Sequence, residues 1–152
     1  MVVMRIEAGA WVVACDGRKA LILENVGDAK FPNLRTRETY EHADEPTHVL
    51  GTAPPGRSYQ SVGNRRSAVD QTDLHDETER LFLRNLAGRL DAAISERKTK
   101  AIIMVAAPRA LGMIREVYSP ALGHAIVHEI AKDVVKQPIH EIETFILQSD
   151  DR

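Results

Sequence analysis

The stretch AWVVACDGRKALILEN, residues 10–25, decides the fold, because two apolar, β-prone runs lie on either side of Asp16-Gly17. An Asp-Gly pair tolerates the positive φ angles that a tight hairpin requires, so the stretch predicts two antiparallel strands. The next segment, NLRTRETYEH over residues 33–42, alternates along its length and carries charge on both faces. This pattern predicts a third antiparallel strand near the edge of the sheet.

The segment over residues 43–72 contains three prolines, three glycines and few large apolar side chains. No regular element of useful length fits such a composition. We therefore predict a long, mobile loop of about 30 residues between the third strand and the helix that follows. Inside a compact domain, a loop of that length usually accompanies function or disorder.

A long helix is predicted from Asp73 to about Lys98. Asp73 is a suitable N-cap, and the acids Asp76, Glu77 and Glu79 lie in the first turns, where the helix dipole favours negative charge. An apolar stripe with helical spacing follows the same segment, formed by Leu74, Leu81, Phe82, Leu86, Leu90, Ala93 and Ile94.

The apolar run AIIMVAAP, residues 101–108, predicts a strand that is covered on both faces. Pro108 then opens a short helix through about Val117, because its fixed φ suits the first helical position. Ser119-Pro120 repeats this start signal for another helical turn.

Residues 124–134 fit both a strand and a helix, and we interpret them as a helix followed by a strand centred near 126–131. Pro138 begins the last helix, whose apolar face is formed by Ile139, Ile142, Phe145 and Ile146. Three antiparallel strands followed by alternating helix and strand predict an α/β fold with a mixed five-stranded sheet and helices against its faces. This order resembles the ribonuclease H-like architecture.

The 152 residues are enough for a single domain with one substantial core. The formal net charge of -2 gives no global attraction to nucleic acid or membrane, so any basic patch must be local. The single cysteine, Cys15, lies in an apolar run and is expected to be a small buried hydrophobe. Because Arg5 and Glu7 interrupt the N-terminal apolar residues, we expect no export signal, no membrane insertion and a cytoplasmic location.

Three arginines and a tyrosine of the predicted loop are candidate RNA-binding residues. Arg57, Arg65 and Arg66 lie among serines and glycines, so a flexible backbone would present three guanidinium groups suited to phosphate. Tyr59 is suited to stacking on a base. In the alternative interpretation the loop is solvated, and its arginines pair with the acids Asp70, Asp73 or Asp76.

The start of the long helix carries candidate metal-binding or catalytic groups. His75 and Glu79 are four residues apart with Asp76 between them, which is a spacing that can bind a metal ion. Capping and the helix dipole already explain the acids, so we predict no metal and no cofactor. A two-metal nuclease needs several converging carboxylates. Asp16 lies in the hairpin turn and the run AIIMVAA contributes no acid, so the sequence argues against that activity.

Arg109 begins a helix directly after the buried strand, where its guanidinium and free backbone N–H groups are suited to an anion. The glycine-rich phosphate turn of nucleotide-binding sites is absent before Pro108. A simple turn from strand to helix is therefore the favoured interpretation.

Longer phrases carry a resemblance to a known family. GRSYQSVGNRRSAVDQTDLHDETERLFLRNLAGRL, AIIMVAAPRALGMIRE, IAKDVV and PIHEIETFI resemble the bacterial family of proteins required for attachment to host cells, from Trp11 to about Leu147. That family is similar to the middle domain of eukaryotic and archaeal peptide-chain release factors. In those factors, a Gly-Gly-Gln tip lies between the third strand and the long helix. The equivalent here is Gly63-Asn64-Arg65-Arg66, without the glutamine, so the resemblance implies the position of a tip rather than peptide release.

Three functions stay open from the sequence, with the oligomeric state undetermined. The leading hypothesis is a cytoplasmic binding module that contacts RNA, on the ribosome or elsewhere, through residues 43–72. The second is a hydrolase of an RNA-linked ester or phosphodiester that uses Asn64, His75, Asp76 and Glu79. The third is a protein-interaction module whose loop orders on meeting its partner.

Overall fold

A computed structural model describes residues 5–42 and 68–149, with side chains in the second range from residue 74 onward. In these ranges the chain forms a five-stranded sheet and four helices, which confirms the predicted α/β class and mixed sheet. The strands are β1 (Trp11–Cys15), β2 (Lys19–Asn25), β3 (Leu34–Glu41), β4 (Ile102–Ala106) and β5 (Ile126–Ala131). The helices are α3 (Ala68–Ser95), α4 (Pro108–Arg115), α5 (Pro120–Ala125) and α6 (Ile139–Gln148).

The sheet has the strand order β3-β2-β1-β4-β5. The first three strands are antiparallel, with Val13 opposite Ile22 in the β1–β2 hairpin. β4 and β5 continue the sheet in parallel with β1. The edge position predicted for the third strand is therefore confirmed, and its charged side chains are mostly exposed.

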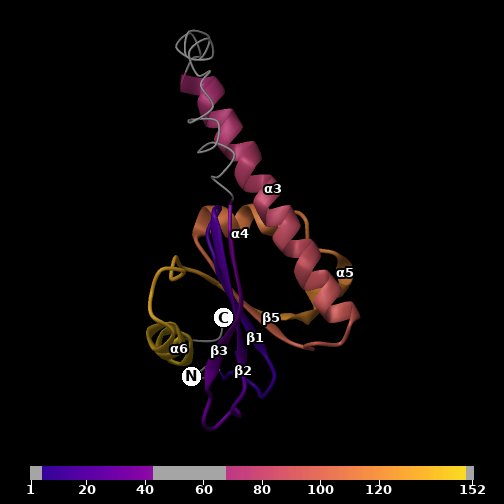
Figure 1. Ribbon diagram of the computed structural model, residues 1–152, viewed down its shortest axis with the longest axis vertical. Coiled ribbons are helices and arrows are strands. Elements are labelled where there is room, and N and C mark those ends of the chain that lie inside the picture. Colours follow the sequence, from indigo (N-terminus) through magenta and orange to yellow (C-terminus); the bar gives the residue numbers. More distant parts are fainter. Residues whose placement is uncertain (1–4, 43–67, 150–152) are drawn as a thin grey trace, which may run out of the picture.

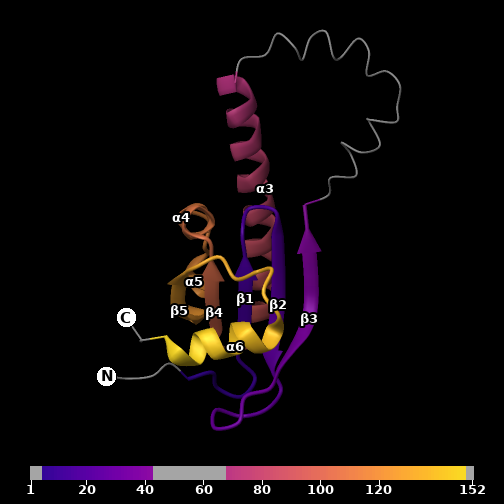
Figure 2. The same cartoon turned by 90° about the vertical axis from the view of Figure 1, so that its left-hand side faces the viewer.

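Helices cover both faces of the sheet, α6 on one face and α3 on the other (Figure 2). Alternate residues of β1 supply the two cores: Val13 and Cys15 pack toward α3, and Val12 and Ala14 pack with α6. Every residue of β1 and of β4 is buried. The continuous apolar run of residues 101–108 therefore does mark a strand covered on both faces, as predicted.

Proline and serine set the starts of the shorter helices. Pro108 is the first residue of α4, and Ser119 caps α5 by accepting a hydrogen bond from the backbone N–H of Leu122 at 3.0 Å. Pro138 is the N-cap of α6, in which Ile142 and Ile146 are buried. These starts agree with the predicted ones.

The long helix begins earlier than predicted. α3 starts at Ala68 rather than Asp73, so the last five residues assigned to the loop, 68–72, are helical. These five residues contain no glycine or proline, so nothing prevents them from being helical. Acids are favourable at any position in the first turns of a helix, so the acidic residues from Asp73 onward do not mark where the helix begins. α3 ends at Ser95. Just after it, Arg97 adopts a left-handed φ of 60°, and the backbone N–H of Lys98 donates a hydrogen bond to the carbonyl of Ala93 at 2.9 Å, which closes the end of the helix.

α3 extends well beyond the sheet at the end where β3 finishes (Figure 1). Leu74 and Leu81, which the sequence assigned to the apolar stripe, are 48% and 53% exposed. The helical period identifies which way a side chain faces, but not where the partner surface ends. From Leu83 onward, the same helix contributes Leu86 and Leu90 to the core.

The connection from β2 to β3 is organised by a buried asparagine that sequence reasoning did not single out. Asn25 is 1% exposed and uses both ends of its amide. Its Nδ2 donates to the carbonyls of Ile6, Glu7 and Asp28, and its Oδ1 accepts from the backbone N–H groups of Gly27 and Asn33, all between 2.8 and 3.2 Å. This network fixes residues 26–33 against the start of the chain.

Candidate functional site at the base of the long helix

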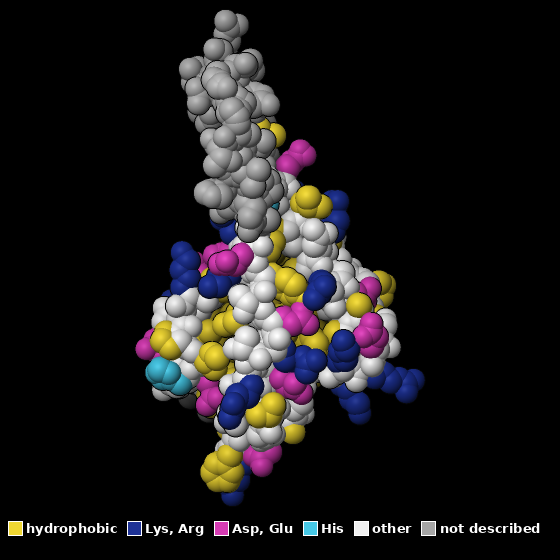
Figure 3. Space-filling view, viewed as in Figure 1, with side chains coloured by type: hydrophobic (Ala, Val, Ile, Leu, Met, Phe, Trp, Pro, Cys, Tyr) yellow, Lys and Arg dark blue, Asp and Glu magenta, His cyan; other side chains and the backbone are white. Residues whose placement is uncertain are grey.

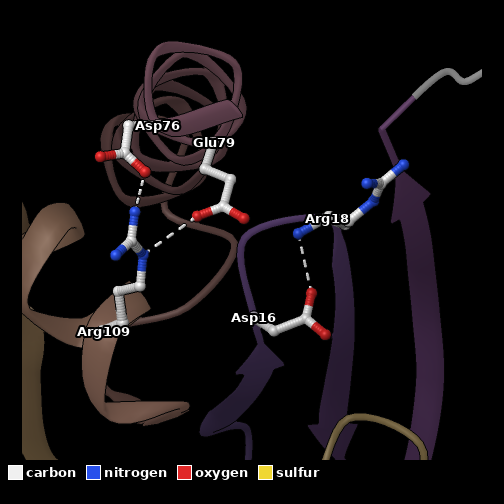
Figure 4. A network of polar contacts seen from close by, with 5 residues as sticks. All are labelled: Asp16, Arg18, Asp76, Glu79 and Arg109. Carbon is white, nitrogen blue, oxygen red and sulfur yellow. Dashed lines mark hydrogen bonds and ion pairs between the residues drawn. The ribbon is translucent and has the colours of Figure 1, made fainter. Parts of the chain in front are cut away.

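Charged side chains of α3 and α4 meet near the ends of β1 and β4, and the β1–β2 turn lies beside them (Figure 4). Asp76 and Glu79 come from α3, and Arg109 is the second residue of α4. The β1–β2 turn contributes Asp16 and Arg18. The structure therefore brings together three of the predicted site residues, Asp76, Glu79 and Arg109.

Arg109 bridges the two carboxylates of α3. Its Nη2 donates to Asp76, and its Nε lies 3.4 Å from Oε1 of Glu79. The arginine side chain is 58% exposed, and those of the two acids are 32% and 26% exposed. Ion pairs this exposed contribute little to stability, about 0–1 kcal/mol each, and they link the side of α3 to the start of α4.

The hairpin turn packs against the same place on α3. Oδ1 of Asp16 accepts the backbone N–H groups of Arg18 and Lys19, both at 2.8 Å, so this carboxylate stabilises the turn. The predicted hairpin is confirmed, but Gly17 has no positive φ. The turn lies close to the helix, because a Cβ at residue 17 would be 2.7 Å from Cδ of Glu79 and the flexible Glu79 side chain would have to move.

The arrangement compensates charge rather than exposing it. Arg109 accompanies two acids, and one oxygen of Asp16 is committed to the turn. In residues 5–42 and 74–149, no three His, Cys, Asp or Glu side chains are grouped so that they can hold a metal ion. An anion approaching Arg109 would have to compete with the carboxylates of Asp76 and Glu79.

The remaining candidates are not part of this cluster. His75 is exposed on α3, while its i+4 neighbour Glu79 is directed to Arg109. The loop candidates Arg57, Tyr59, Asn64, Arg65 and Arg66 lie outside the described residues. Their predicted roles in RNA contact or catalysis stay predictions.

A second polar network joins α3 to β3, and sequence reasoning missed it. The Arg89 guanidinium donates to Oε1 of Glu38 at 2.8 Å and stacks 4.6 Å from the centre of the Tyr40 ring. The hydrogen bond from Arg89, followed by that from the Tyr40 hydroxyl, lowers the pKa of Glu38. Arg89 is separated from Glu38 by 51 positions, so no local pattern signals the pair.

Cys15 is buried, as predicted, and its thiol is poorly suited to act as a nucleophile. Burial is the largest factor that raises its pKa, to about 12, and the negative charges of Asp16 and Asp133 add to the effect. At neutral pH the thiolate is therefore scarcely populated.

Comparison with known proteins decides the family. The family model described as "Protein required for attachment to host cells" matches residues 11–146. The chain belongs to this family. A search of curated proteins gave no match. The matched range of this host-attachment-family chain includes all five strands and the cluster around Arg109.

None of the helices in the described part of this host-attachment-family chain is both long enough and apolar enough to cross a membrane. α3 has sufficient length at 28 residues, but charged side chains recur along it.

Proposed function

We propose that this host-attachment-family chain is a cytoplasmic RNA-binding module, acting on the ribosome, whose Gly- and Arg-bearing segment 57–66 contacts RNA. We also propose that its fold is ribonuclease H-like and that it is related to the middle domain of release factors. The observation that carries it is the projection of α3 beyond the sheet (Figure 1), because residues 57–66 end two positions before the first residue of this helix.

α3 has the dimensions of a rigid stem. Its 28 residues span about 42 Å at a rise of about 1.5 Å per residue. Among residues 74–95, Phe82 is the first of the hydrophobic side chains that pack against the core and Leu83 is the first that is fully buried, so residues 74–81 lie outside the core. α3 is therefore anchored at its C-terminal half and projects its first turns away from the bulk of the described domain.

The anchored half of the stem is fixed in two ways. Leu83, Leu86 and Leu90 pack into the core on the α3 side of the sheet. At the surface, Arg109 bridges to α3, and Arg80 of α3 reaches Oε1 of Glu116 at 3.2 Å. Burial supplies most of the stability, and the ion pairs restrict how the helix can tilt.

Attraction to RNA must come from a local group of cations. The face seen in Figure 3 mixes Lys and Arg with Asp and Glu side chains, and the whole chain has a net charge of -2. Arg57, Arg65 and Arg66 lie within ten residues of one another, with no Asp or Glu between them. Tyr59, in the same stretch, adds a ring on which a base can stack.

Binding is favoured over hydrolysis for a structural reason. The carboxylates of Asp76 and Glu79, which a hydrolase would use as acid or base, are both engaged by Arg109. Their positions suit the support of the stem better than proton transfer.

The test is fluorescence anisotropy of a labelled single-stranded RNA titrated with protein at several salt concentrations, together with sedimentation of extracts on sucrose gradients. Replacing Arg57, Arg65 and Arg66 by Ala is expected to weaken binding and to reduce the salt slope by about 0.7 for each phosphate that is no longer neutralised, hence by about 2 in total. The charge-matched control replaces the exposed Lys100, Lys132 and Lys136 by Ala and should bind like the wild type.

Two results would overturn the proposal. One is a wild-type protein that binds no RNA at low salt and stays wholly in the soluble fraction. The other is equal weakening by the arginine and lysine triple variants. Co-sedimentation that survives nuclease treatment would assign the segment to a protein partner instead.

A further inference from the structure

The side of α3 that faces away from the sheet carries two leucines that a single chain does not bury. Leu74 and Leu81 are exposed, and neither belongs to a core of the described domain. Leu81 precedes the buried Leu90 by nine positions, which is about two and a half helical turns, so the two side chains lie on opposite sides of the helix. Leu74 lies seven positions before Leu81, about two turns, and shares its side.

The outer face of α3 is defined here by Leu74, Glu77, Leu81, Arg84 and Gly88, all of which are exposed. The first four are among the residues that line a surface hollow of about 350 Å³. At Gly88 the face is open, because an added Cβ would meet no neighbouring atom within 4 Å. The outer face therefore combines two apolar side chains, two opposite charges and one position without a side chain.

The two charges of the outer face are not paired within the chain. Glu77 and Arg84 are about 10 Å apart along the helix axis, which is too far for a salt bridge. Among the residues whose side chains the structure describes, neither forms an ion pair. Other charged side chains of the same helix do form ion pairs, namely Asp76, Glu79, Arg80 and Arg89.

We propose that the outer face of α3 binds the same face of a second copy of this chain, with the two helices antiparallel and a two-fold axis at Leu81. Leu81 then packs against Leu81 of the second copy. Leu74 lies over Gly88 of the second copy, where no side chain obstructs it. Glu77 lies beside Arg84 of the second copy, and the symmetry makes this ion pair twice.

A second copy is the partner that this face fits, because a two-fold contact requires a surface that is complementary to itself. The outer face carries a leucine together with the open glycine position that receives it, and an acid together with the base that it meets. The charges also select the direction of the helices. In a parallel pair each residue would face its own counterpart, so that acid would meet acid and base would meet base.

The contact is expected to be weak. Residues 74–88 span about 22 Å of helix, and a single helix pair of this length is smaller than the interfaces of stable dimers. We expect a dissociation constant on the order of 100 µM, so most chains are single at about 5 µM and most are paired at about 500 µM. The contact uses none of residues 57–66, so it does not depend on RNA binding.

Sedimentation equilibrium of the full-length chain over this concentration range measures the pairing. Leu81→Glu places two like charges at the two-fold axis and is expected to weaken association by about tenfold or more. Val127→Glu is the matched control, because Val127 is 51% exposed, against 53% for Leu81, but lies on β5. This variant should associate like the wild type. Both positions are exposed, so the two variants should fold, and thermal melting checks this.

Exchanging the charges tests the antiparallel arrangement. Glu77→Arg and Arg84→Glu each place like charges beside one another, so each variant alone should associate about fivefold more weakly or worse. The double variant Glu77→Arg/Arg84→Glu forms both ion pairs again and should associate like the wild type. In a parallel pair like charges face each other in every one of these variants, so the three would not differ in this way.

Three results would overturn the proposal. The first is a wild-type chain that sediments as a single copy at about 500 µM, five times the expected dissociation constant. The second is equal weakening by Leu81→Glu and Val127→Glu, which would locate the contact outside the outer face of α3. The third is a double charge variant that associates as weakly as the single ones, since the two helices would then not be antiparallel.

Discussion

Shortening leucines along α3 should produce two very different effects on stability. Leu83 and Leu90 are fully buried in the core, so Leu→Ala at either position should lower the free energy of unfolding by about 2–5 kcal/mol. Leu74 and Leu81 are 48% and 53% exposed. The same change there removes only partly buried surface and leaves no enclosed cavity, so it should cost about 1 kcal/mol or less.

Urea denaturation followed by circular dichroism measures these differences, provided that the dependence on denaturant stays unchanged among the variants. For a chain of this size, a loss of about 3 kcal/mol corresponds to a fall in Tm of about 6–12 °C. Hydrogen exchange adds a local measurement, since amides of residues 74–81 should exchange by local opening, and those of residues 83–93 by global unfolding.

The outcome bears directly on the proposed function, because it tests whether the first half of α3 is a stem outside the core. If Leu81→Ala costs as much as Leu90→Ala, the N-terminal turns of α3 are buried in solution and the projecting helix is wrong. Strong exchange protection over residues 74–81 leads to the same conclusion.

Two further predictions concern packing and pH. Gly27→Ala should destabilise the protein by about 2–4 kcal/mol, because the added Cβ lies 2.3 Å from the carbonyl oxygen of Phe31 and the hydrogen-bonded loop must shift. Gly88→Ala, at a helical position with open space around it, should instead stabilise the protein by about 1 kcal/mol. If urea denaturation gives the same free energy of unfolding for both variants, the close contact at Gly27 is contradicted. Because the pKa of Glu38 is lowered in the folded state, its stabilising effect is present above the unfolded pKa of about 4.3 and is lost as the pH falls through the folded value. The stability difference between wild type and Glu38→Gln should therefore shrink below about pH 4. A difference that stays constant from neutral to acid pH would show that the ionised Glu38 carboxylate is not what stabilises the fold.

The starts of α4, α5 and α6 were predictable because their signals are local. Pro108 and Ser119-Pro120 fix the beginnings of α4 and α5 through a preset φ and a side-chain cap, and each signal spans only a few residues. β5 was recovered at residues 126–131 despite its ambiguous pattern. The buried character of β4 followed from an uninterrupted apolar run.

What the sequence did not indicate depends on distant partners. Arg109 was identified as a candidate, but its contacts with Asp76 and Glu79 cross 33 and 30 positions of the chain. The Asp16-Gly17 pair marked the hairpin, but Gly17 has no positive φ, and its closeness to the Glu79 side chain of α3 was not signalled by the turn itself. The network of Arg89, Glu38 and Tyr40 likewise needs α3 and β3 to be placed relative to one another.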